Sequence, residues 1–349
     1  MGIFLCKIYF RYWKEEDSDN HELIDLKLIN KLNHSNYKEQ IEDVIIFPKL
    51  ENTIFIGCSS GDIKEISELI PNDTKEESNT KITILYSFSK RLYSLILLKS
   101  NNNKFCVGLL DEIVILKLNL DNGHKLEKVI EFSIPSEGPL YLLLELENGN
   151  ILSAGKNIIL WKKKSENKYD NVKGIPIGNS RIINLIEFPF YKTIIATQDN
   201  THLIFLIKNE ENRIYLINKI DKIPSIWYKG SAQLLTKDGM ILVGNFELNV
   251  IDPANGKIIS RYPGVGKGNL LNISKKGKEK DFWIVSDFLG KNFEFYKQEG
   301  NDLIFYDKIE LEEKDEIKMG NRLYKLKDNY FVAINHNGDI FVFNIKKTI

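Results

Sequence analysis

Short apolar strands recur along the whole chain in units of four. Each unit opens with a uniformly apolar stretch, which leads through a turn into a second strand that ends in small residues. After a turn containing Gly, Asp or Asn comes a strand of alternating apolar and polar positions, and then a more polar fourth strand. Period-two alternation is typical of strands with one wet face. Sustained 3.6-residue periodicity is absent, so we expect few helices.

The spacing of these units is nearly constant. The third strand of each unit ends on an apolar residue, at Ile66, Leu116, Trp161, Leu206, Ile251, Tyr296 and Phe343. The successive gaps are 50, 45, 45, 45, 45 and 47 residues. A period of about 45 residues is that of a four-stranded propeller blade. The pattern therefore predicts an all-β fold, a seven-bladed β-propeller of four-stranded antiparallel blades.

The two ends of the chain complement each other. The last unit stops after its third strand, whereas His21–Leu32 has the pattern of an outer strand with no inner strands before it. Pairing the two would close the ring and remove exposed sheet edges. We therefore expect one propeller domain over residues 1–349, with 21–33 as the outer strand of the closing blade. Residues 1–20 are expected to form an extra N-terminal strand, Ile3–Trp13, and a linker.

The repeat resembles that of the WD-repeat propellers. The Trp-Asp ending of that family is matched in part by Trp161-Lys162 and by Ile251-Asp252. The Asp of the tight turn before the third strand is present as Asp62, Asp111 and Asp339. The Gly-His pair of the family is absent, so no buried Asp–His–Ser–Trp network is expected. Apolar packing between blades should then hold the ring together.

Charge and cysteine content indicate the class of protein and its cellular compartment. Lys plus Arg and Asp plus Glu both total 48, giving a net charge of zero. A nucleic-acid binder needs a basic surplus, so this class is disfavoured. No apolar run approaches the roughly 20 residues of a membrane-spanning helix, so a membrane protein is disfavoured too. Cys6, Cys58 and Cys106 show no C-x-x-C spacing, which indicates reduced thiols and a cytoplasmic protein.

Catalytic motifs are missing from the sequence. There is no phosphate-binding P-loop, no H-E-x-x-H and no G-x-S-x-G. We therefore expect no catalytic residue, no metal and no cofactor, and we interpret the glycine-rich run Pro263–Asn269 as a connecting loop. A propeller enzyme, either a lactonase-like hydrolase or a quinoprotein, stays open as the alternative. It would need a metal or cofactor in the channel, where Asp62, Asp111 and Asp199 could converge.

The expected binding residues lie where inner strands begin. In a propeller, the loops from each outer strand to the next inner strand share one face, the top face. These starts carry Arg91, Arg181 and Arg322, with Trp227 and Tyr228 in the fifth unit and Lys267 in the sixth.

Arg, Trp and Tyr dominate interface energetics. The hypothesis is a non-catalytic scaffold that binds a protein or peptide partner, acidic or aromatic-anchored, and is monomeric by itself within a larger complex. The alternative is that the arginines pair with acidic residues of adjacent blades and only staple the ring.

Overall fold

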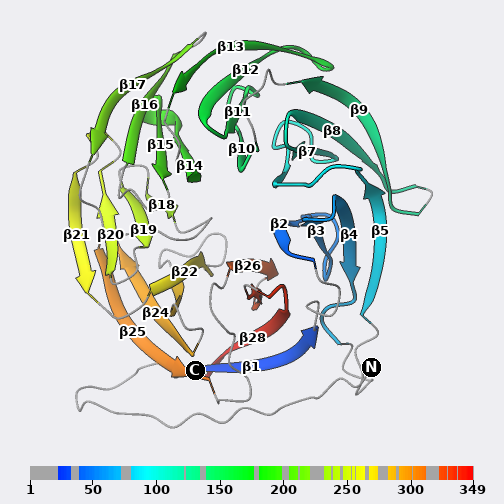
Figure 1. Ribbon diagram of the computed structural model, residues 1–349. Helices are drawn as coiled ribbons and strands as arrows, with labels where there is room; N and C mark the ends of the chain where they lie inside the picture. The colour runs from blue at the N-terminus through cyan, green and yellow to red at the C-terminus, as the bar shows by residue number, and fades with distance from the viewer. Residues whose placement is uncertain are drawn as a thin grey trace.

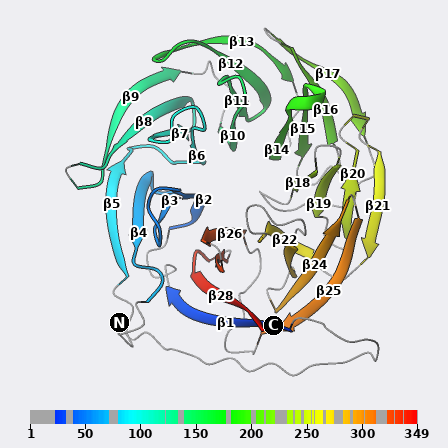
Figure 2. The same cartoon turned by 180° about the vertical axis from the view of Figure 1, so that it is seen from behind.

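The chain folds as a ring of four-stranded sheets (Figures 1 and 2). The structure is a computed structural model. It describes residues 23–32, 39–71, 80–121, 123–133, 139–176, 181–198, 204–210, 213–220, 232–236, 239–243, 247–252, 254–255, 257–263, 267–273, 282–287, 291–300, 302–311, 322–327, 329–335 and 337–348. Within these ranges the only helix is the single 3-10 turn Pro189–Tyr191. No helix among them is long and apolar enough to span a membrane.

Six blades are each formed by four consecutive strands, ordered from the ring axis outwards. Blade 1 comprises β2 (Ile41–Ile46), β3 (Ile54–Cys58), β4 (Asp62–Ser67) and β5 (Lys81–Ser87). Blade 2 comprises β6 (Ser94–Leu97), β7 (Lys104–Gly108), β8 (Glu112–Asn119) and β9 (Lys125–Ser133). Blade 3 comprises β10 (Leu142–Glu145), β11 (Ile151–Ala154), β12 (Asn157–Ser165) and β13 (Lys168–Pro176).

The second half of the ring repeats the same order. Blade 4 comprises β14 (Ile182–Phe188), β15 (Thr193–Gln198), β16 (Ile204–Glu210) and β17 (Arg213–Ile220). Blade 5 comprises β18 (Ala232–Thr236), β19 (Gly239–Val243), β20 (Glu247–Ile251) and β21 (Ile258–Pro263). Blade 6 comprises β22 (Lys267–Asn272), β23 (Phe282–Asp287), β24 (Asn292–Glu299) and β25 (Asp302–Glu310).

The seventh blade joins the two ends of the chain. It consists of β26 (Arg322–Lys327), β27 (Tyr330–Ile334), β28 (Ile340–Thr348) and, outermost, β1 (Leu23–Leu32). The antiparallel register runs from Leu23 opposite Thr348 to Leu32 opposite Ile340. In Figure 1 the blue strand β1 lies against the red strand β28. The predicted propeller of seven four-stranded blades, closed by strands from both ends, is confirmed across the described residues; the expected strand Ile3–Trp13 lies outside them.

A side chain of β1 also reaches the next blade. Asn30 is 2% exposed, and its amide nitrogen donates to the carbonyl of Leu69 at 2.8 Å and to the Thr80 hydroxyl oxygen at 3.1 Å. Both acceptors lie in the connection between β4 and β5 of blade 1. The N-terminal strand therefore links blade 7 to blade 1 as well as completing blade 7.

Apolar side chains fill the spaces between neighbouring blades, as the sequence predicted. Phe55 of blade 1 lies 5.2 Å from Phe105 of blade 2, measured between ring centroids. At the closing seam, Phe293 of blade 6 contacts Phe331 and Phe343 of blade 7, with centroids 5.5 and 5.4 Å apart. All five rings are at most 1% exposed. The hydrophobic effect thus acts mainly across blade boundaries, where each small sheet buries a face on its neighbour.

In blades 1 and 2 a glycine lies at or next to the end of the second strand, where residues of the next blade pack against it. A Cβ on Gly57 would lie 2.7 Å from Leu92 Cδ2, and one on Gly108 would lie 3.1 Å from the carbonyl oxygen of Leu140. Leu92 and Leu140 lie just before the inner strands of blades 2 and 3. Glycine at these positions therefore lets adjacent blades approach closely.

One hydrogen bond departs from the sequence expectation. The indole nitrogen of Trp161, which is 2% exposed, donates to the hydroxyl of buried Ser153 at 2.9 Å. The Trp–Ser hydrogen bond of the Asp–His–Ser–Trp network, which we did not expect, is thus present in blade 3. The two residues face each other because Trp161 and Ser153 lie on adjacent, antiparallel strands.

Candidate interaction site on the top face

The inner strands all begin at one end of the ring, and this end is the top face. The register of the first two strands in each blade shows that Glu42, Tyr93 and Tyr141 occupy the same place in blades 1, 2 and 3. Arg91 and Arg181 also share a place, two residues further towards the preceding outer strand, in blades 2 and 4. An arginine at this place can therefore lie over the residue of the preceding blade that is equivalent to Glu42.

Arg91 is placed in this way over blade 1. Its guanidinium nitrogen Nη2 lies 2.5 Å from the Glu42 carboxylate and 3.3 Å from Oε1 of Gln40. The hydrogen bond to Glu42 raises the pKa of Arg91 above its ordinary value, so the side chain stays charged. Its side chain is 46% exposed, so the pair is a surface contact of modest strength.

Aromatic rings continue the row across blades 2 and 3. The Arg91 guanidinium carbon lies 5.3 Å from the Tyr93 ring centroid. The Tyr93 and Tyr141 rings meet edge to face, 5.7 Å apart at 87°. Exposed Arg181 of blade 4 then lies over Tyr141, with 5.4 Å between its guanidinium carbon and the ring centroid. Such cation–π contacts favour a guanidinium held flat against the ring.

We call Glu42, Arg91, Tyr93, Tyr141 and Arg181 the Arg–Tyr row. It crosses four successive blades. Both tyrosines are half-buried and both arginines are exposed, so the rings are held in place while charged groups face solvent. Planar guanidinium groups can bind carboxylates in bidentate fashion, and fixed aromatic rings bury area at low entropic cost.

Arg322 has a different role from Arg91 and Arg181. Its guanidinium donates to the carbonyl of Glu42 at 2.6 Å and also to the carbonyl of Ile41. Both acceptors belong to β2, so Arg322 ties blade 7 to blade 1. The physical reason is register: Arg322 pairs with Ile334 inside the sheet, whereas Arg91 precedes the first paired residue of β6.

The other predicted residues are placed less fully. Lys267 is the first residue of β22, at the top end of blade 6, and its side chain is outside the described part. Trp227 and Tyr228 lie outside the described residues. The structure thus brings Arg91 and Arg181 into one row. It adds Tyr93 and Tyr141, which sequence reasoning missed, although Leu-Tyr stands before both inner strands, at 92–93 and 140–141.

The acidic residues considered for a channel site have other contacts. Asp62 accepts a hydrogen bond from the Ser87 hydroxyl at 2.6 Å, and Asp111 lies 2.8 Å from the Lys90 ammonium. Within the described ranges no three His, Cys, Asp or Glu side chains are grouped to hold a metal ion. Asp199, His202 and His336 lie outside those ranges.

The two described cysteines are buried and free. Burial raises the pKa of the Cys58 thiol to about 12, and burial raises that of Cys106 as well. Since the thiolate is the reactive form, both are inert at neutral pH and act as small apolar side chains.

Comparison with known proteins finds similar folds among solved structures. No family model and no curated protein matches the sequence. Among solved structures, a chain of the mitotic checkpoint complex matches with a TM-score of 0.59 at 8% identity, covering 88% of this chain and 95% of that one. A chain from the crystal structure of BBS1N in complex with ARL6DN, soaked with mercury, matches with a TM-score of 0.59 at 13% identity, covering 88% and 92%. At these identities the likeness shows the fold.

Proposed function

We propose that the protein is a non-catalytic scaffold that binds a protein partner on its top face, through the Arg–Tyr row. The observation that carries the proposal is the row itself, in which two exposed arginines flank two half-buried tyrosines across adjacent blades. Arg and Tyr are over-represented among residues that dominate binding energy. Both similar structures are described as complexes, which supports a role in protein–protein interaction.

The charges of the row favour a partner segment with an acidic residue. Arg91 already faces Glu42, so its charge is partly balanced. The Arg181 guanidinium lies over the Tyr141 ring at the other end of the row. A carboxylate of the partner would be attracted to the two exposed guanidinium groups, and an aromatic or aliphatic side chain would pack on Tyr93 and Tyr141.

The binding surface proposed from the sequence continues around the ring. Trp227 and Tyr228 precede the inner strand of blade 5, the next blade after that of Arg181, and Lys267 begins that of blade 6. They belong to the proposal as its continuation, whereas Arg322 is committed to β2. We further propose that a single copy of the chain works within a larger complex in the cytoplasm. The free thiols of Cys58 and Cys106 support the cytoplasmic location.

Quantitative affinity purification from the native cell tests the proposal. The double variant Tyr141→Ala/Arg181→Ala should lose at least one partner that the wild type captures. Truncating one hot-spot side chain costs about 2 kcal/mol or more, so affinity should fall by at least about thirtyfold even if only one of the two is a hot spot.

A matched control uses the same residue types on another surface. Arg213 and Tyr215 are exposed on the outer strand β17, away from the top face. Arg213→Ala/Tyr215→Ala should retain every partner. If both double variants are folded and capture the same partners as the wild type, the top-face proposal is rejected.

A further inference from the structure

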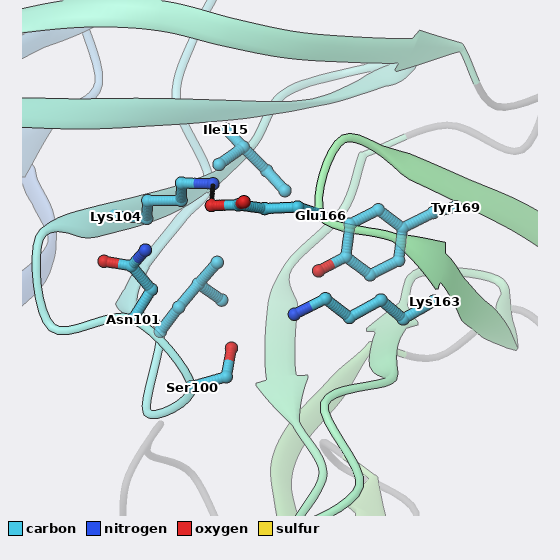
Figure 3. A pocket seen from close by; sticks show the side chains of 8 residues that line it. Ser100, Asn101, Lys104, Ile115, Lys163, Glu166 and Tyr169 are labelled. Atoms are coloured by element: carbon cyan, nitrogen blue, oxygen red, sulfur yellow. Dashed lines mark hydrogen bonds and ion pairs between the residues drawn. The ribbon is translucent and has the colours of Figure 1, made fainter.

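A second site lies on the opposite, bottom face, at the boundary between blades 2 and 3. A cavity of about 140 Å³ opens there between the β6–β7 turn and the β12–β13 turn (Figure 3). Its polar lining consists of Ser100, Asn101, Lys104, Lys163, Glu166 and Tyr169. None of these residues belongs to the Arg–Tyr row.

Lys104 is a buried cation that is paired with a solvent-exposed carboxylate. Its side chain is 8% exposed, and its ammonium lies 3.0 Å from Oε1 of Glu166. The Glu166 side chain, at the tip of the β12–β13 hairpin, is 72% exposed. A buried ammonium needs an anion beside it. Glu166 meets that need while remaining largely hydrated, so another anion can take its place beside Lys104 without a buried carboxylate having to be released.

Lys163 supplies a second cation to the same space. Its side chain is directed into the cavity, towards the β6–β7 turn (Figure 3). Lys104 lowers the pKa of Glu166, and Lys163 and Lys117 lower it further to a smaller extent, because their positive charges favour the carboxylate form. Among the described residues no carboxylate forms an ion pair with Lys163; its neighbour Lys164 is the one paired with Asp170, at 3.5 Å.

Uncharged polar side chains and one further carboxylate also lie at or near the cavity. Burial raises the pKa of the Tyr169 hydroxyl, so this group stays protonated and can donate. Asn101 lies across the cavity with its side-chain amide. Behind Ser100 lies Glu145, which is 2% exposed; its oxygens already accept from the Ser100 hydroxyl and from the backbone N–H groups of Lys99 and Ser100.

We propose that this cavity binds a phosphate monoester group and that Glu166 occupies the anion position until the ligand displaces it. With Glu166 withdrawn, Lys104 and Lys163 present two positive charges to the ligand. A phosphate monoester carries about −1.5 to −2 charges at pH 7 and three acceptor oxygens, which matches two ammonium groups and a hydroxyl.

The same reasoning disfavours a carboxylate ligand. A carboxylate carries one charge, as Glu166 does, and would compete with a group already tethered beside Lys104 at a high effective concentration. Only a ligand that also uses Lys163 gains over the internal anion. This inference does not depend on the proposed top-face function.

Titration calorimetry on the full chain, at constant ionic strength, tests the site with inorganic phosphate, phosphoserine and acetate. Phosphate and phosphoserine should bind saturably, with acetate at least tenfold weaker. Glu166→Gln removes the tethered competitor and should tighten phosphate binding about fivefold or more. Lys163→Met removes one charge-assisted contact and should weaken it about tenfold or more.

Lys164→Met is the matched control, because Lys164 is the adjacent lysine and its partner is Asp170; phosphate affinity should not change. Tighter binding of phosphoserine than of phosphate would support a phosphorylated side chain as the source, and equal binding a small phosphate compound. The proposal is overturned if wild type and Glu166→Gln bind phosphate no better than acetate. It is also overturned if Lys163→Met and Lys164→Met weaken binding equally, with unchanged melting temperatures showing that each variant is folded.

Discussion

Phe343→Ala should lower the free energy of unfolding by about 4 kcal/mol, since truncating a buried phenylalanine costs about 3–5 kcal/mol. The Phe343 ring is fully buried at the closing seam, stacked on Phe331 at 5.0 Å and 15° and touching Phe293 of blade 6. It lies directly opposite Leu28 of β1. Its loss leaves a cavity where both ends of the chain meet, and chemical denaturation measures the cost.

Phe305→Ala provides the matched control for this prediction. Phe305 lies on the outer strand β25 and is 55% exposed, so its removal should cost less than about 1 kcal/mol. Equal losses for the two variants would contradict the placement of Phe343 in a packed seam.

Gly61→Ala should cost about 3 kcal/mol, the second largest effect expected. Gly61 has a φ of +99°, a conformation that L side chains rarely adopt. An added Cβ would lie 2.5 Å from the carbonyl oxygen of Lys90 and 2.6 Å from that of Phe88. Both oxygens belong to the backbone that leads to Arg91, so relief requires moving the connection between blades 1 and 2.

Gly123→Ala separates the two parts of this effect. Gly123 also has a positive φ, +74°, but an added Cβ would meet nothing within 4 Å. Its replacement should cost only about 1 kcal/mol, from the backbone conformation alone. Denaturation of both variants measures the difference. A Gly61 variant as stable as the Gly123 variant would show that this turn is not packed against the connection between blades 1 and 2.

The architecture was predictable because the repeat length and the incomplete first and last units can both be recognised in the sequence. A third strand ending every 45 residues or so identifies the blade, and all seven predicted end positions, from Ile66 to Phe343, fall in the third strand of their own blade. Closure through His21–Leu32 followed from the cost of an unpaired edge, and β1 pairs with β28 as expected.

The side-chain partners at the top face were not predictable in the same way. Arg91 and Arg322 both stand near the start of an inner strand, but one faces a carboxylate and the other two backbone carbonyls. The difference depends on strand register and on which acceptor groups of the adjacent blade lie nearby. Hydrophobic periodicity predicts neither. The alternative, pairing with an acidic residue of the adjacent blade, describes the contact of Arg91 with Glu42. Arg322 also joins two blades, but through backbone carbonyls, and the Arg181 guanidinium lies over the Tyr141 ring.

Hydrogen exchange across β1 tests most directly whether the chain is a closed ring. Residues 23–32 form an outer strand paired on one side with β28, as residues 125–133 form an outer strand paired on one side with β8. Mass spectrometry of the intact chain should therefore show similar protection for peptides covering the two segments. Exchange of 23–32 at the rate of an unstructured peptide, with 125–133 still protected, would contradict ring closure.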